Sequence, residues 1–169
     1  MTRPILADAF AHHAWANLRL IDACQPLNEE QLATVVPGTY GTILDTVRHL
    51  VGADAGYLFV LTGGKVAEIE EGGMNIAELR AAEVTFGAAW PALVAGDLDP
   101  DEVLIRVRDD GTKSLAPLGI RLAQVLHHGS DHRSQVCTAL TNLGVEPPPI
   151  DVWDFAWTQG RLSEVPPPA

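Results

Sequence analysis

The chain carries six histidines, and three of them fall within one short stretch, Leu126–Arg133. His128 and His132 are four residues apart, so in a helix their side chains leave the same face. This spacing lets two imidazoles reach one cation at Zn–N distances of roughly 2.0–2.1 Å. Gly129 lies between them, and its missing side chain is expected to leave space beside the pair. The pair indicates a metal site, although two helical histidines at this spacing also occur as a surface feature.

The residues around His128 and His132 restrict the kind of metal site that the two histidines can form. His132 shares a helix face with apolar residues, where an imidazole without a partner costs free energy. The metalloprotease motif H-E-x-x-H requires a Glu directly after the first histidine as general base, and Gly129 occupies that position. A zinc protease of that class is therefore excluded. A catalytic ion would need a third protein ligand elsewhere in the chain and one open position.

His49 is the candidate for that third ligand. It lies in a helical pattern with a mainly apolar stripe, which includes Val47 and Leu50 and also carries the acid Asp54. On a helical wheel, His49 falls about 140° from the centre of this stripe. From the spacing alone, a solvated or hydrogen-bonded position at the flank of the helix is favoured over a ligand role.

Asp54 and Asp131 are the acidic residues that could support such a site. Asp54 lies in an apolar seam, where it could accept an imidazole N–H, as carboxylates do behind metal ligands; equally, it could pair with Arg48 or Arg121. Asp131 could orient an imidazole or act as a base. However, it points about 100° away from its neighbour His132, which favours a solvated charge.

His13 and Asn17 are polar residues on the inner seam of the first helical pattern. Two interpretations stay open for them: they line a substrate pocket, or they satisfy each other by hydrogen bonding. No catalytic residue is assigned from the sequence.

Helical periodicity predicts the elements that must position these residues. Apolar residues at spacings of three and four predict long helices at about 5–24, 42–62, 75–95 and 118–143. Alternating residues between Gly96 and Pro117 predict a small β-hairpin or an extended crossover. A short segment at 150–159, with Trp153, Phe155 and Trp157, is expected to pack across the helices. We therefore predict an all-α fold, a four-helix bundle forming a single domain over 1–169.

Composition excludes several classes of function. Lys and Arg total 11 against 22 Asp and Glu, which gives a net charge of −11 and makes nucleic acid a poor partner. Two cysteines, neither in a C-x-x-C pair, exclude a disulfide scaffold and a cysteine-based zinc site. No run of 18 or more apolar residues predicts a membrane span. The N-terminus lacks the features of a signal peptide, so a cytoplasmic location is expected.

Three segments carry a resemblance to a known family. They are HAWANLRL at 13–20, GTYGTILDTVRHL at 38–50, and HHGSDHRSQV at 127–136 with the following LTNLGVEPP at 140–148. Together they resemble the DinB/YfiT-like family over nearly the whole chain. The resemblance implies a four-helix bundle in up-down-down-up order, with one divalent metal held by three histidines. Those ligands map to His49, His128 and His132. Zinc and nickel are the leading candidates, with iron, manganese and cobalt also considered.

The same resemblance implies a function. Family members with assigned activities resemble metal-dependent S-transferases or isomerases that use low-molecular-weight bacterial thiols. We therefore expect a metal-dependent enzyme with a small-molecule substrate and a thiol cosubstrate, and a homodimer, as relatives often form. The alternatives are a metal-dependent hydrolase and a metal-binding or stress-associated protein without turnover.

Overall fold

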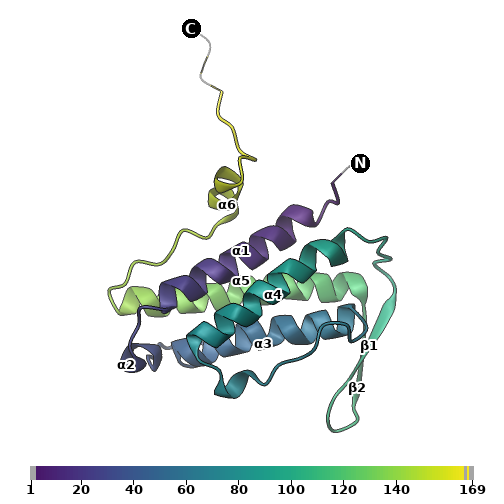
Figure 1. Ribbon diagram of the computed structural model, residues 1–169, viewed down its shortest axis with the longest axis horizontal. Helices are drawn as coiled ribbons and strands as arrows, with labels where there is room; N and C mark the ends of the chain where they lie inside the picture. The colour runs from purple at the N-terminus through teal and green to yellow at the C-terminus, as the bar shows by residue number, and fades with distance from the viewer. Residues whose placement is uncertain (1–2, 166, 168–169) are drawn as a thin grey trace.

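The structure is a computed structural model that describes residues 3–165 and 167, and it is mostly helical (Figure 1). The predicted domain, 1–169, therefore extends at both ends to residues outside the described ones. None of the described helices is long and apolar enough to cross a bilayer. In chain order the elements are α1 (Ala7–Cys24), α2 (Glu29–Leu32), α3 (Ile43–Leu61), η1 (Glu71–Gly73), α4 (Ile76–Val94), β1 (Val103–Val107), β2 (Lys113–Pro117), α5 (Leu118–Asn142) and α6 (Val152–Thr158).

The ends of the long helices follow from local capping signals. The side chain of Thr42 accepts the backbone N–H of Asp45 at the start of α3. Asn75 and Glu78 form a capping box at the start of α4. Gly144, at φ +74°, follows the end of α5 in the left-handed conformation that glycine adopts readily. Helices α2 and η1 were not predicted, because both are short and bury no residue, so no apolar periodicity marks them.

The four long helices lie side by side and enclose the apolar core (Figure 1). Helix α1 packs against α4 and α5, and α3 packs against the same two helices. Fully buried side chains fill the space between them, among them Phe10, Leu20, Leu50, Leu79, Trp90 and Leu140. This packing places the middle of α3 beside the middle of α5, where the predicted metal ligands lie.

Strands β1 and β2 pair antiparallel, with Ile105 opposite Leu115, so a hairpin rather than an extended crossover precedes α5. Arg121 Nη2 donates to the carbonyls of Leu104 and Ser114, which ties the hairpin to α5. The alternating apolar residues of the hairpin face solvent instead of the core: Val103, Ile105, Val107 and Leu115 are all exposed.

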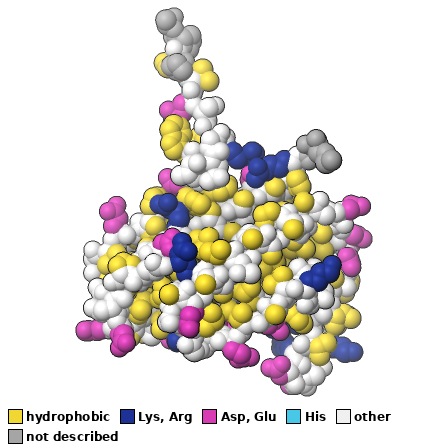
Figure 2. Space-filling model, in the orientation of Figure 1, with side chains coloured by type: hydrophobic (Ala, Val, Ile, Leu, Met, Phe, Trp, Pro, Cys, Tyr) yellow, Lys and Arg dark blue, Asp and Glu magenta, His cyan; other side chains and the backbone are white. Residues whose placement is uncertain are grey.

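The C-terminal helix α6 packs against α1 (Figure 1). Phe155 is buried, with edge-on ring contacts to His12 and Trp15. The segment packs on the helices through Phe155, whereas Trp153 and Trp157 are 68% and 62% exposed. Figure 2 shows apolar side chains on this projecting part of the chain and acidic ones along the margin of the same face.

Candidate metal centre

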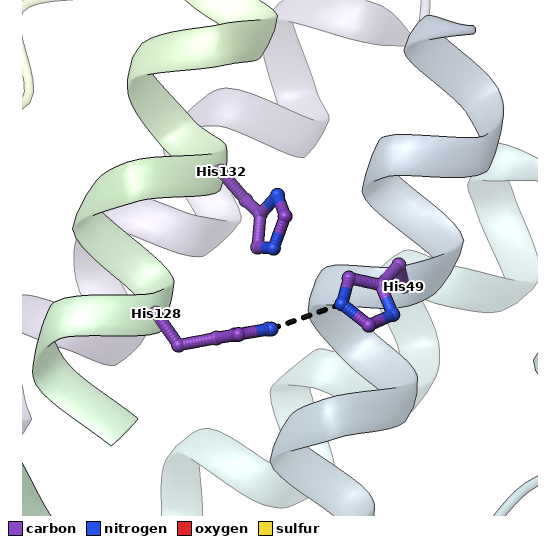
Figure 3. Close-up of side chains that lie close together, drawn as sticks. All are labelled: His49, His128 and His132. Atoms are coloured by element: carbon purple, nitrogen blue, oxygen red, sulfur yellow. Dashed lines mark hydrogen bonds between the residues drawn. The ribbon is translucent and has the colours of Figure 1, made fainter. Parts of the chain in front are cut away.

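Three histidines from two helices converge in the space between α3 and α5 (Figure 3). His49 comes from α3, and His128 and His132 come from successive turns of α5. One nitrogen from each lies within 4.8 Å of the others, and the Nε2 atoms of His49 and His128 are 3.0 Å apart. The side chain of His49 turns inward, although its wheel position alone favoured the flank. His132 is buried, and the other two are half-buried.

Tyr40, in the loop before α3, holds two of these rings in place. Its ring stacks on His49 at a centroid distance of 4.2 Å and an interplanar angle of 8°. It meets His132 edge-on at 5.4 Å. The loop itself is anchored to α5, because the backbone N–H of Tyr40 donates to Gln135 Oε1 at 2.9 Å. The stacked ring leaves His49 little freedom to rotate away from the other two histidines.

Gln135 determines which nitrogen of His132 faces the cluster. A backbone N–H can only donate, so the Gln135 atom that Tyr40 contacts must be the carbonyl oxygen. His132 Nδ1 lies 3.1 Å from that same oxygen and must therefore carry a proton and donate. In the neutral ring this leaves the lone pair on Nε2, where a metal ligand needs it. The sequence could have revealed Gln135 through its spacing of three residues from His132.

Asp131 contacts no imidazole. Its carboxylate is exposed and accepts a hydrogen bond from Gln135 Nε2 at 3.1 Å. The predicted solvated position is therefore the one observed, and any effect on His132 passes through Gln135. The bond also orients the Gln135 amide with its oxygen toward Tyr40 and His132.

The surroundings favour the neutral form of two imidazoles of the cluster, His49 and His128. Burial lowers the pKa of His128 to about 4, with the neighbouring charges of His132 and His49 acting in the same direction. Burial, followed by the charge of His132, also lowers the pKa of His49, while Glu71 opposes this shift. A neutral imidazole presents a lone pair, so the arrangement fits a metal ion. His128 Nδ1 is buried without a hydrogen-bond partner in the described residues.

A second polar group lies on the core side of α5. It contains His13 and Asn17 from α1, Asp54 from α3, Glu83 from α4 and Arg133 from α5, all buried. Asp54 Oδ2 lies 2.8 Å from His13 Nε2 and accepts from Asn17 Nδ2 at 3.2 Å. Arg133 donates to Asn17 Oδ1 at 2.7 Å, and Asn17 donates to Glu83 Oε1 at 3.1 Å. We call these five side chains the buried network.

The buried network decides between the sequence-based alternatives. His13 and Asn17 are fully buried and hydrogen-bond to Asp54 and the other members of the buried network, so they line no open pocket. Asp54 pairs with neither arginine considered for it: Arg48 donates instead to the carbonyl of Met74, and Arg121 binds the hairpin. Glu83 was missed, although an acid within the apolar stripe of its helix was a visible signal.

The missing side chain of Gly129 makes room for members of the buried network rather than for a metal ion. A Cβ atom at this position would lie 2.6 Å from His13 Nδ1 and 2.8 Å from Arg133 Nη1. The expectation that its missing side chain leaves open space beside the histidine pair is therefore wrong. The space is filled by the imidazole of His13, because α1 and α5 approach each other closely here.

A pocket of about 550 Å³ opens beside His49, the one histidine of the cluster among its lining residues. Its lining comes from the loop before α3, the first turns of α3 and the η1 segment: Tyr40, Gly41, Asp45, Arg48, His49, Glu71 and Gly72. The volume lies in the range of small-molecule sites. His49 belongs both to the cluster and to this wall, so a molecule in the pocket would lie next to the metal ligands.

A family model matches this chain. The model of the DinB family covers residues 1–165, which is almost the entire sequence. The chain belongs to the DinB family. None of the curated proteins matches it. Family membership and the three-histidine cluster together fit a DinB-like protein that binds a metal ion.

Proposed function

We propose that this DinB-family protein holds one divalent metal ion per chain through His49, His128 and His132. The observation that carries the proposal is the convergence of three imidazoles, with one nitrogen of each within 4.8 Å of the others. Zinc and nickel suit three nitrogen ligands best, and iron, manganese and cobalt are further candidates. The hydrogen bond from His132 Nδ1 to Gln135 supports the same assignment, because it directs the Nε2 lone pair inward.

We further propose a metal-dependent enzyme, an S-transferase or a related enzyme that uses a low-molecular-weight thiol. A bound divalent ion would supply a Lewis acid that lowers the pKa of a thiol or of water. The chain's own contribution is positional: Tyr40 and Gln135 hold the ligand rings, and the adjacent pocket admits a small molecule. Asp54 is engaged with His13 and Asn17, which supports an open coordination position over one closed by this carboxylate.

The test of metal binding is elemental analysis of protein purified without a metal-affinity column. We expect close to one ion per chain in the wild type and almost none in the H49A, H128A and H132A variants. H127A is the matched control, because His127 is exposed on the same helix beside His128. Unchanged metal content in the three ligand variants would refute the assignment.

The test of the reaction compares metal-loaded with chelated protein against a panel of thiols and electrophilic acceptors. Turnover that requires both metal and thiol supports the transferase. Turnover of esters or amides without thiol would identify the hydrolase instead. Absence of any turnover in a fully loaded protein would favour a binding or stress-associated protein.

We also propose the architecture and assembly implied by the resemblance. The neighbour pairs α1–α4, α4–α3, α3–α5 and α5–α1 support a single-domain, up-down-down-up four-helix bundle (Figure 1). The exposed Trp153 and Trp157 on α6 support a homodimer, because large apolar side chains in solvent often mark interfaces. Light scattering should give twice the chain mass, and a W153S/W157S variant should lower it. The cytoplasmic location stays a prediction that cell fractionation tests.

A further inference from the structure

The pocket beside His49 contains charges of both signs, and one of its acids, Glu71, has no ion pair within the described residues. Arg48, on α3, donates through Nε to the carbonyl of Met74 at 2.9 Å, and its Nη1 lies 3.6 Å from Asp45 Oδ1, in an ion pair within the same pocket. These contacts use Nε and Nη1 of the guanidinium and leave its Nη2 without a protein partner in the described part of the chain. Glu71, on η1, and Nη2 of Arg48 are therefore available to a molecule in the pocket.

Glu71 is held next to the metal site by a notch in α3. Gly52 lies one helical turn after His49, and a Cβ at Gly52 would lie 2.6 Å from Glu71 Oε1 and 2.8 Å from Oε2. Only a residue without a side chain lets this carboxylate rest against the helix. Its oxygens accept no hydrogen bond from the described residues, and its charge raises the pKa of His49. Glu71 is thus a half-buried carboxylate close to the cluster that lacks a protein partner.

We propose that this pocket binds a small zwitterion, a molecule carrying one ammonium and one carboxylate group, with the ammonium on Glu71 and the carboxylate on Arg48. The carboxylates of Asp45 and Glu71 would repel a simple anion, and the guanidinium of Arg48 would repel a simple cation. A zwitterion matches both charges and leaves neither without a partner. The inference rests on the proposed function only in that the ligand's third group, a thiol, faces the histidines.

The experiment uses metal-free protein and three thioethers, so that neither metal nor thiolate contributes to binding. S-methyl-L-cysteine carries both charges, S-methylcysteamine lacks the carboxylate, and 3-(methylthio)propionate lacks the ammonium. Calorimetry or ligand-observed NMR should show that the zwitterion binds about tenfold or more tightly than either relative, as expected for one charge-assisted hydrogen bond. Equal affinity for the three compounds, or no binding of any at millimolar concentration, would overturn the proposal.

Matched variants assign each charge to its residue. E71Q should abolish the preference for S-methyl-L-cysteine over 3-(methylthio)propionate and keep the preference over S-methylcysteamine. R48M should show the reverse pattern, and R48K, which retains the charge, should keep part of the preference. E70Q is the control, because Glu70 is exposed, adjacent in sequence and outside the pocket. If E71Q leaves both preferences unchanged, the ammonium is not bound there and the proposal fails.

A second arm separates this inference from the proposed function. L-cysteine should bind the metal-loaded protein more tightly than S-methyl-L-cysteine does, whereas the two should bind the metal-free protein alike. If the thioethers show the expected charge preference and the thiol gains nothing from metal, zwitterion binding stands and the thiol function fails. If metal strengthens binding of every thiol regardless of its charges, the thiol function stands and this inference fails.

Discussion

The buried network and the metal centre both include side chains of helix α5, and the two groups differ in what their polar atoms contact. In the buried network, side chains from four helices bond to one another, and all of them lie out of reach of solvent. In the metal centre, three imidazoles direct nitrogens at one another, and the Nε2 atoms of His49 and His128 lie at hydrogen-bond distance. Within the described residues, His128 Nδ1 lacks a hydrogen-bond partner, and so do Asp54 Oδ1 and Glu83 Oε2 of the buried network. The comparison therefore separates a group whose side chains bond across four helices from a group whose ring nitrogens converge on one point, where a metal ion can bind them together.

The two groups also differ in charge. Arg133 contributes a guanidinium to the buried network, where Asp54 and Glu83 favour its charged form against the cost of burial. Burial, followed by the charge of Asp54, raises the pKa of Glu83 well above its ordinary value. The metal centre consists of three imidazoles, and burial lowers the pKa of His49 and His128, which favours their neutral, metal-binding form.

The largest effect is expected from removing the cation of the buried network. R133A leaves Asp54 as a buried charge without its compensating partner, and it removes the hydrogen bonds to Asn17 and Ser130. We expect a loss of about 3–5 kcal/mol in the free energy of unfolding. Denaturant unfolding of the metal-free protein measures it. A loss below about 1 kcal/mol would mean that the buried network contributes little to stability.

The next effect tests the metal centre without removing a ligand. Q135A deletes the acceptor of His132 Nδ1 and of the Tyr40 backbone N–H, so the ring loses its fixed tautomer and the loop loses its anchor. Metal affinity should fall about 10–100-fold, as it does when groups behind metal ligands are removed. Competition with a chelator measures the affinity. D131N is the control, since it leaves Gln135 in place and should change affinity far less.

Gly129 lies between the two groups and tests whether they are independent. G129A places a methyl group against His13 and should cost about 1–3 kcal/mol of stability through overpacking. Because its Cβ points toward the buried network, the variant should still bind one metal ion per chain. Thermal unfolding measures the loss of stability, and elemental analysis of the same sample measures the metal content. Loss of metal in a folded G129A protein would show that the two groups are coupled.

The smallest expected effect is a difference in pH dependence. Since the folded-state pKa of Glu83 is raised, its proton stabilises the folded protein at low pH. That stability is lost as pH rises from the ordinary value of 4.5 through the raised folded pKa. E83Q cannot lose this proton, so its stability should fall less with rising pH, by at most about 1.4 kcal/mol for each pH unit. Urea unfolding between pH 5 and 8 provides the comparison, and parallel curves would contradict the raised pKa of Glu83.

Much of the helical framework could be predicted because its signals are local. Thr42, Asn75 and Gly144 mark helix ends through contacts within a few residues, and periodicity marks the buried faces. Spacing also predicted that His128 and His132 share a face. His49 is different: its inward direction depends on how α3 is rotated against α5, which no spacing within α3 contains. The resemblance to the family, rather than the wheel, pointed to it.

The misreading of Gly129 and the omission of Glu71 have the same cause. Each depends on a side chain distant in sequence that occupies the space above a glycine: His13 above Gly129, and Glu71 above Gly52. A glycine in the sequence indicates that something approaches the helix closely, but it does not identify what approaches. That identity is a property of how the helices and loops pack.

By itself, the sequence determined the helices, the paired histidines of α5 and the family, because each is encoded in neighbouring residues or in a motif. Tertiary structure alone decided the direction in which the His49 side chain points, the contact between Asp54 and His13, and the meeting of opposite charges in one pocket. These facts arise from the relative rotation and separation of helices. Packing of many side chains sets those quantities together, and no single segment encodes them.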